Sequence, residues 1–256
     1  MAPARRNRLA LAARRICAFG RKGLRGPPLN PIRGQGFLRI PIHREGWPFI
    51  AFSAVLNLLL ILLFGNWGWL MLPVTLWVVA FFRDPERTAP TGAGLVICPA
   101  DGKLLPVVQA VPPAELDMGS GAMTRLSIFM NVFNVHVNRA PCDGTVTKLA
   151  YRPGKFFNAS FDKASTDNER MSMRLRVTAE GGVAEKDIAV VQIAGLVARR
   201  IVSETGEGLH LCRGARFGII RFGSRVDVYL PGDVSVTAKA GQTVRAGETI
   251  LASYRS

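Results

Sequence analysis

The sequence is poor in the residues on which most metal and redox centres depend. Its 256 residues include three histidines and four cysteines, and no two cysteines form a C-x-x-C pair. We therefore expect neither a zinc site nor a disulfide framework, and no metal is predicted. The cysteines are scattered along the chain, as expected of a reduced, cytoplasmic domain; they are Cys17, Cys98, Cys142 and Cys212.

Acidic residues are absent from positions 1–44, which carry eleven arginines or lysines. The formal net charge of the chain is +15, but the remaining residues hold 22 basic against 18 acidic side chains. The basicity therefore belongs to an N-terminal arm, residues 1–44, and not to a folded face. Such an arm suits either nucleic acid or an anionic lipid surface, and the segment after it decides between these.

Charge of either sign is missing from Trp47 to Phe82, a run of 36 residues. The sequence Gly65-Asn66-Trp67-Gly68 interrupts the run and leaves two apolar stretches, Pro48–Phe64 and Trp67–Phe82. Each is close to the lower limit for crossing a bilayer, about 17 residues. Buried core helices are the alternative, but two adjacent uncharged stretches favour a hydrophobic, membrane-associated helical hairpin over residues 45–87.

The flanks of this hairpin indicate its orientation. Arg44 precedes it and Arg83 and Arg87 follow it, so the positive-inside rule puts both ends on the cytoplasmic side. The run begins too late and continues too long for a cleavable signal peptide. We expect an anchor at the cytoplasmic face of the cell membrane, with the basic arm on anionic headgroups and no nucleic-acid partner.

From Thr88 onward, short β-branched runs alternate with glycine and proline, which predicts a mainly β (α+β) domain over residues 88–256. Near the C-terminus, Gly241 and Gly247 occupy turn positions of a strand-turn-strand pattern similar to barrel-sandwich folds. Only Ala194–Val202 is expected to form a helix in this domain. The expected strands include Gly94–Cys98, Gly102–Val108, Arg125–Phe129, Gly144–Leu149, Met171–Val177, Ile188–Ile193, Ala215–Phe222 and Arg225–Leu230.

Three short segments place polar groups among these strands. Asp101 precedes a glycine, His136 lies between Asn134 and Asn138, and Gly223 precedes Ser224. Carboxylate, imidazole and hydroxyl together can activate a serine, because the imidazole takes the hydroxyl proton while the carboxylate fixes its tautomer. No G-x-S-x-G elbow surrounds the serine, so attack on the chain's own preceding carbonyl fits better than acyl transfer to another molecule.

Longer stretches around these residues carry a resemblance to a known family. They cover most of residues 80–231 in order and read F-F-R-D-P-E-R (81–87), P-A-D-G-K (99–103), M-N-V-F-N-V-H-V-N-R-A-P (130–141), Y-R-P-G-K-F-F-N-A-S-F-D-K-A-S (151–165), N-E-R (168–170) and R-F-G-S-R-V-D-V-Y-L-P (221–231). The chain resembles the phosphatidylserine decarboxylase proenzymes of the short bacterial type. It departs from the family's longer branch, which has a second histidine near Arg139 and a small hydroxyl residue where Arg225 follows the serine.

The resemblance implies a self-processing enzyme of phospholipid biosynthesis. Ser224 would attack the Gly223 carbonyl with His136 as base and Asp101 orienting it, and β-elimination would leave a β chain, 1–223, and an α chain, 224–256. The two chains would stay together as a heterodimer. Ser224 would become a covalent pyruvoyl group that forms a Schiff base with membrane phosphatidylserine and releases carbon dioxide and phosphatidylethanolamine. The candidates for holding the lipid phosphate are Arg139, Lys155 and Arg170.

Two other classes of protein compete with this interpretation. Asp162-Lys163-Ala164 matches the triplet around lipoylated lysines, so a carrier module is one alternative. A purely structural basic membrane protein is the other. Both would remain a single chain, whereas the decarboxylase would be found as two chains.

Overall fold

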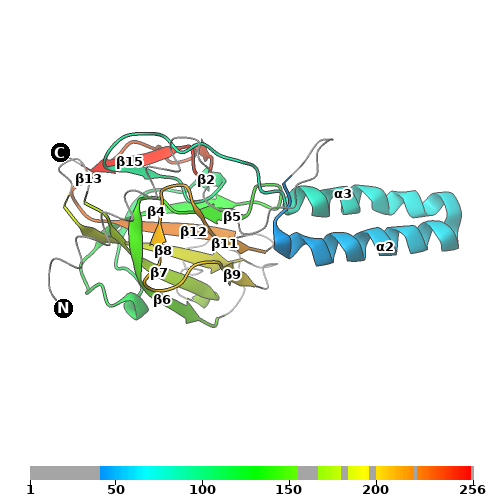
Figure 1. Cartoon of the computed structure of the whole chain (residues 1–256), viewed down its shortest axis with the longest axis horizontal. Coiled ribbons are helices and arrows are strands. Elements are labelled where there is room, and N and C mark those ends of the chain that lie inside the picture. Colours follow the sequence, from blue (N-terminus) through cyan, green and yellow to red (C-terminus); the bar gives the residue numbers. More distant parts are fainter. Residues whose placement is uncertain (1–40, 155–166, 180–183, 196–199, 222–223, 255–256) are drawn as a thin grey trace. The chain divides into compact units, whose positions relative to one another are not determined.

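The computed structural model describes residues 41–154, 167–179, 184–195, 200–221 and 224–254. Figure 1 shows a pair of apolar helices followed by a domain built almost entirely of strands, which confirms the predicted fold class. Residues 1–40, which make up nearly all of the predicted basic arm, lie outside the described residues. Residues Ile40–Ser256 belong to one compact unit.

The helical elements are η1 (Arg44–Gly46), α2 (Trp47–Phe64), η2 (Gly65–Met71), α3 (Leu72–Phe81) and η3 (Ala114–Leu116). The strands are β1 (Leu95–Ile97), β2 (Gly102–Leu104), β3 (Val108–Ala110), β4 (Met123–Met130), β5 (Val137–Arg139), β6 (Gly144–Arg152), β7 (Arg170–Val177), β8 (Lys186–Ala194), β9 (Ile201–Ser203), β10 (His210–Leu211), β11 (Arg216–Ile220), β12 (Ser224–Leu230), β13 (Val234–Val236), β14 (Thr243–Val244) and β15 (Ile250–Tyr254).

The described strands form three antiparallel sheets. The largest has nine strands in the order β10-β6-β7-β8-β12-β4-β2-β14, with β3 also paired to β4. The two smaller sheets have the orders β1-β15-β13 and β5-β11-β9. Gly241 and Gly247 flank β14 with φ of 83° and 78°, a backbone conformation in which a Cβ is strained, so the two turns predicted from these glycines are present.

Strand β12 lies at the centre of the large sheet and is buried along its whole length. Its side chains alternate between two apolar layers, as the period of a strand requires. Val226, Val228 and Leu230 belong to the main core cluster, whereas Tyr229 belongs to a second cluster with Leu116 of η3. Both faces of the strand are covered, so its polar residues Ser224, Arg225 and Asp227 are buried together with the apolar ones.

Helices α2 and α3 run side by side as a hairpin, with η2 at the turn (Figure 1). Polar groups lie between the two legs. Asn57 donates to the Gly68 carbonyl over 3.3 Å, and Thr75 donates to the Ser53 carbonyl over 3.4 Å. Gly68 is required because a Cβ there would overlap the backbone of Ile61.

The outward surface of this hairpin is apolar. Large exposed side chains occur along all its segments: Phe52, Val55, Leu58, Leu59, Leu62, Leu63, Phe64, Trp67, Trp69, Leu70, Val74 and Leu76. The helical stretch Arg44–Phe81 is long and apolar enough to cross a membrane, and 11% of its apolar window is buried. Polar groups inside and apolar groups outside are the arrangement expected of helices packed in lipid. By length and composition, this stretch can serve as a membrane anchor.

The predicted helix at Ala194–Val202 is wrong at both of its ends. Strand β8 continues to Ala194, and strand β9 begins at Ile201. Residues 196–199 lie outside the described residues. Ala194 pairs with Ser224 and Ile201 pairs with Ile220, so backbone pairing across the sheets overrides the local helical pattern.

Candidate active site

Ser224 is the first residue of β12 and is fully buried. It lies opposite Met130 of β4 on one side and Ala194 of β8 on the other. Its Oγ has no hydrogen-bond partner among the described residues. A buried hydroxyl without a partner costs free energy, so the fold holds this group ready for an interaction that the rest of the sheet does not supply. Gly223 lies outside the described residues.

His136 lies just beyond the end of β4 that pairs with Ser224. The chain leaves β4 at Met130, makes a tight turn over Asn131–Asn134, and enters β5 at Val137. The His136 backbone carbonyl accepts from Ile220 of β11, four residues before Ser224. The serine and the imidazole therefore lie at one end of the sheets, as their predicted partnership requires.

The position and tautomer of His136 are set by two contacts. Its Nδ1 lies 3.0 Å from the carbonyl oxygen of Asn134, which can only accept, so Nδ1 carries the proton. Its ring lies against Phe81, with 4.2 Å between ring centroids and 30° between planes. The remaining nitrogen, Nε2, is buried and has no partner among the described residues. An unprotonated Nε2 is the form of imidazole that accepts a proton.

The surroundings of His136 favour this neutral form. Burial lowers the pKa of the imidazole to about 4; the bond to the Asn134 carbonyl opposes the shift, and the positive charge of Arg83 adds to it. Near neutral pH the ring is therefore an uncharged base.

Asp101 lies just before β2, which is hydrogen-bonded to β4. Its Oδ1 accepts from the backbone N–H of Ala246 over 2.7 Å, and its Oδ2 accepts from Arg87 over 3.0 Å. Strand β4 lies between β2 and β12 in the sheet. The backbone at Asp101 is therefore two strand spacings, about 10 Å, from β12, at the same end of the sheet as Ser224. The contacts of the described residues include no bond between Asp101 and His136; the Asn134 carbonyl holds the imidazole instead.

Two of the three predicted phosphate ligands already have partners. Arg139 donates to Gly214, Pro85 and Asp84, and it is 5% exposed. Arg170 forms two hydrogen bonds with the Glu115 carboxylate. Lys155 lies outside the described residues, as does the carrier-like triplet at 162–164.

Sequence reasoning missed several residues of this site. Phe81 and Arg87 belong to the F-F-R-D-P-E-R stretch, but nothing in that stretch indicated contacts with His136 and Asp101. A buried amide pair was also missed: Gln192 donates to Asn138 over 2.8 Å, and Asn138 contacts the sulfur of Met130. The polar Q in the apolar run Ile188–Ala194 was the available signal for this pair.

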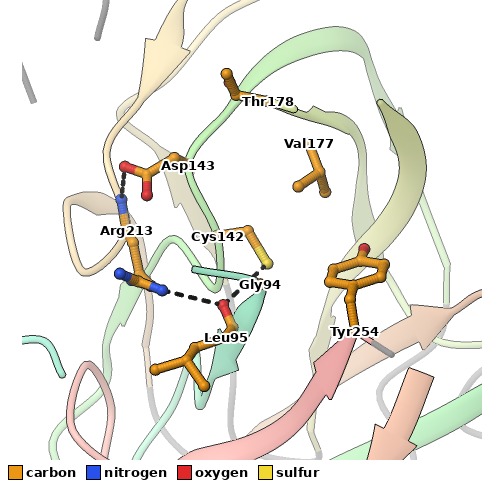
Figure 2. Close-up of a pocket in the computed structure, with 8 residues that line it drawn as sticks. All are labelled: Gly94, Leu95, Cys142, Asp143, Val177, Thr178, Arg213 and Tyr254. Carbon is orange, nitrogen blue, oxygen red and sulfur yellow. Dashed lines mark hydrogen bonds between the residues drawn. The ribbon is translucent and has the colours of Figure 1, made fainter. Parts of the chain in front are cut away.

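A separate cavity lies away from these residues, beside β1 and the end of β15 (Figure 2). Its volume is about 20 Å³, room for a water molecule or two. Arg213 on its wall donates to the carbonyls of Gly92 and Leu95, and burial raises the pKa of the Cys142 thiol to about 12. A thiol that remains protonated is a poor nucleophile, so Cys142 is not a candidate nucleophile.

One family model and several known proteins match most of this chain. A family model described as "Phosphatidylserine decarboxylase" matches residues 74–252. A "Phosphatidylserine decarboxylase proenzyme" of Cereibacter sphaeroides (strain ATCC 17025 / ATH 2.4.3) is 55% identical over 216 residues, which cover 84% of this chain and 91% of the relative. A protein of the same name from Paramagnetospirillum magneticum (strain ATCC 700264 / AMB-1) is 54% identical over 220 residues, covering 86% and 90%.

Proposed function

Because the chain belongs to the phosphatidylserine decarboxylase family, we propose that it decarboxylates phosphatidylserine after cutting itself between Gly223 and Ser224. One observation carries the proposal of self-cutting. The Ser224 hydroxyl is buried without a partner at the sheet end that also holds a neutral imidazole with its acceptor nitrogen unoccupied.

The cut follows from the chemistry of these groups. The Ser224 Oγ attacks the carbonyl carbon of Gly223 while Nε2 of His136 takes the hydroxyl proton, and the acyl group moves from nitrogen to oxygen as an ester. Loss of the Ser224 Cα proton then breaks the Cβ–Oγ bond and leaves a carboxylate on Gly223. The resulting enamine tautomerises to an imine, which takes up water and loses ammonia, so that position 224 ends as a pyruvoyl group.

The pyruvoyl group supplies an electron sink for the loss of carbon dioxide. The residues around it supply burial and proton transfer. Ser224 is fully buried between Met130 of β4 and Ala194 of β8, which keeps water away from position 224. We assign to His136 the delivery of a proton to the product carbon, from Nε2 after this nitrogen has taken up a proton. Asp101 is kept as the proposed carboxylate of the site; its bonds to Ala246 and Arg87 fix it at the sheet end, and it would have to exchange one of them to orient the imidazole that the Asn134 carbonyl holds.

The two chains are expected to remain one heterodimer after the cut. Strand β12 would belong to the α chain, yet its neighbours β4 and β8 belong to the β chain. The bond from Ala246 to Asp101 also joins the two chains. A segment of 33 residues is too short to bury a core alone, so its folded state depends on the β chain.

The apolar hairpin explains how such an enzyme would meet a lipid substrate. A diacyl lipid stays in the bilayer, and an anchored enzyme searches that surface without extracting it. We place the protein at the cytoplasmic face of the cell membrane, with the basic arm on anionic lipid, and its product in phospholipid biosynthesis. For the lipid phosphate, Lys155 stays a candidate, whereas Arg139 and Arg170 would first have to release carboxylates.

Intact-mass measurement of purified protein tests the proposal. We expect two chains whose masses add up to the precursor plus one water minus one ammonia; plain hydrolysis would add one water. Ser224→Ala should remain a single chain without activity, and His136→Ala should block or strongly slow the cut. Release of carbon dioxide from phosphatidylserine by uncut Ser224→Ala protein would contradict the proposal. Normal two-chain maturation of His136→Ala would remove the histidine from the role of base.

A further inference from the structure

The end of the hairpin reaches the proposed base directly. Phe81 is the last residue of α3 and is 1% exposed, and its ring is the one that stacks on His136. Phe81 belongs to an apolar cluster that joins the hairpin to β5 and β11 and also contains Val78, Phe82, Val135, Val137 and Ile219. The ring face of the imidazole is therefore fixed by a residue of the membrane anchor.

Arg83 reaches the same imidazole through the turn before it. Its Nη2 donates to the carbonyl of Phe133 over 2.7 Å, and its Nη1 donates to the carbonyl of Ala80 over 2.6 Å. The turn is closed by its own bonds, from the backbone N–H of Asn131 to the Asn134 side chain and from that of Phe133 to the Asn131 side chain. Arg83 thus ties the end of α3 to the turn whose next carbonyl holds Nδ1 of His136.

The start of the hairpin contacts Arg221, which lies just before the predicted cut. Arg221 stands two residues before Gly223, and its guanidinium pairs with Glu45 in η1. The same guanidinium lies over the ring of Phe49 in α2, 5.1 Å from its centroid. The end of the hairpin nearest the sheets therefore contacts both His136, the proposed proton acceptor, and Arg221, which leads into the predicted cut.

We propose that Phe81 and Arg83 are positioning residues for His136, and that the docked hairpin is a working part of the maturation site in addition to being an anchor. This inference rests on the proposed function, because it assigns the base and the cut as above. Self-cutting then takes place only in molecules whose hairpin has docked on β5 and β11, which links the making of the active group to correct assembly of the membrane segment.

The physical reason is that the rate of proton transfer depends strongly on the position of the accepting atom. A misplacement of about 1 Å at a reacting group can cost about a hundredfold in rate. The imidazole is free to turn about its Cβ bond unless its ring face and its Nδ1 are both held. Phe81 holds the face, and Arg83 holds the turn that holds Nδ1.

The test compares full-length variants in membranes or detergent, with the rate of conversion of one chain into two as the readout. Phe81→Met keeps nearly the same volume but removes the ring, and Arg83→Gln removes the charge and one arm of the fork. We expect each to slow the cut about 10- to 100-fold. Leu76→Ala, an exposed position on the same helix, is the matched control and should cut at the wild-type rate.

The pH profile of cutting separates positioning from general damage. Only the neutral imidazole accepts a proton, so the wild-type rate should fall on acidification through a pKa of about 4. Burial lowers this pKa and Arg83 lowers it further, so Phe81→Ala and Arg83→Gln should move the acid limb upward, toward the ordinary histidine value of about 6.5.

The outcomes distinguish failure of the positioning role of Phe81 and Arg83 from failure of the proposed self-cutting function. Normal cutting rates in Phe81→Met and Arg83→Gln, together with an unmoved acid limb in Phe81→Ala and Arg83→Gln, would overturn the positioning role, even if wild-type protein matures as expected. Slow cutting with an unmoved acid limb and a lowered unfolding temperature would reduce both residues to structural roles. A wild-type chain that is never cut would instead sink the proposed function.

Discussion

Arg225 and Asp227 carry opposite charges inside the large sheet, immediately after Ser224, the proposed reactive serine. Arg225 is 1% exposed, and its Nε and Nη2 donate to the two carboxylate oxygens of Asp227 over 2.6 and 2.9 Å. Both side chains lie on the face of β12 opposite to Ser224, because the three positions alternate along the strand. The arginine that follows Ser224 in this chain is thus built into the core and lies on the face away from the Ser224 side chain.

Removing one of these charges should be costly. Arg225→Ala leaves the Asp227 carboxylate buried without its arginine, and we expect a loss of about 3–5 kcal/mol in the free energy of unfolding. Urea unfolding of the variant measures it. Arg225→Met combined with Asp227→Leu should recover most of the loss, since no charge then stays buried. A stability unchanged by Arg225→Ala alone would show that Asp227 finds another partner.

The short helix η3 illustrates the same use of charge at the level of elements. Glu115 in η3 accepts from Arg170 at the start of β7 over 2.6 and 2.8 Å, and from Ser172 on the same strand over 2.9 Å. Leu116, the next residue, is fully buried against Tyr229 and Val191. The ion pair fixes η3 over the sheet while Leu116 closes the second apolar cluster.

This contact should make stability depend on pH. Burial acts to raise the pKa of Glu115, but the bonds from Arg170 and Ser172 outweigh it and lower the pKa to about 2, from an ordinary 4.5. A lowered carboxyl pKa stabilises the fold above about pH 4.5, and this contribution is lost as the pH falls toward 2. Glu115→Gln should therefore flatten the decline of unfolding temperature across that window. An equally steep decline in the variant would assign the acid sensitivity to other carboxyls.

The hairpin shows how an element can be packed without an apolar inner face. Its legs meet at Gly68 and through the side chains of Asn57 and Thr75, and its leucines point outward. Helix α2 has 18 residues and is about 27 Å long, close to the roughly 30 Å of a bilayer's hydrocarbon core. In water this arrangement would expose most of its apolar surface, so the element makes sense only against lipid or another apolar partner.

At the scale of the whole molecule, the predicted cut divides a sheet and not a pair of domains. Strand β12 pairs with β4 over seven residues and with β8 over six, and β15 pairs with β1. An ion pair between Arg87 and Glu248, and a hydrogen bond from the Ala246 N–H to Asp101, also join the two sides of the predicted cut. If the cut takes place as proposed, the two chains are therefore held together by the strand pairing of the core itself.

The matured protein should behave as one particle. We expect the α and β chains to elute together in size-exclusion chromatography in mild detergent and to separate only in urea or guanidinium at the unfolding transition. Ser224→Ala, which keeps a single chain, is the control for the elution volume. Release of the α chain without unfolding would show that β12 is not held as the sheet order requires.

The sequence by itself indicated the β-rich domain and its longer strands, the candidate site residues and the apolar hairpin. Local patterns specify these: β-branched runs between glycines, a charge-free run of 36 residues, and polar side chains set into apolar strands. It also predicted strand bounds at Arg125–Phe129 and Arg225–Leu230 that lie within β4 and β12. These features depend on neighbours along the chain, and a sequence displays its neighbours directly.

Only the tertiary structure decided which groups touch. In the structure, Nδ1 of His136 bonds to the Asn134 carbonyl, and the ring of Phe81 packs on the face of the imidazole. The carboxylate of Asp101 accepts from Ala246 and Arg87. The tertiary structure likewise turned the ends of Ala194–Val202 into strands. Contacts between residues 14 to 145 positions apart are set by sheet register and by packing of one layer on another, which no local pattern encodes.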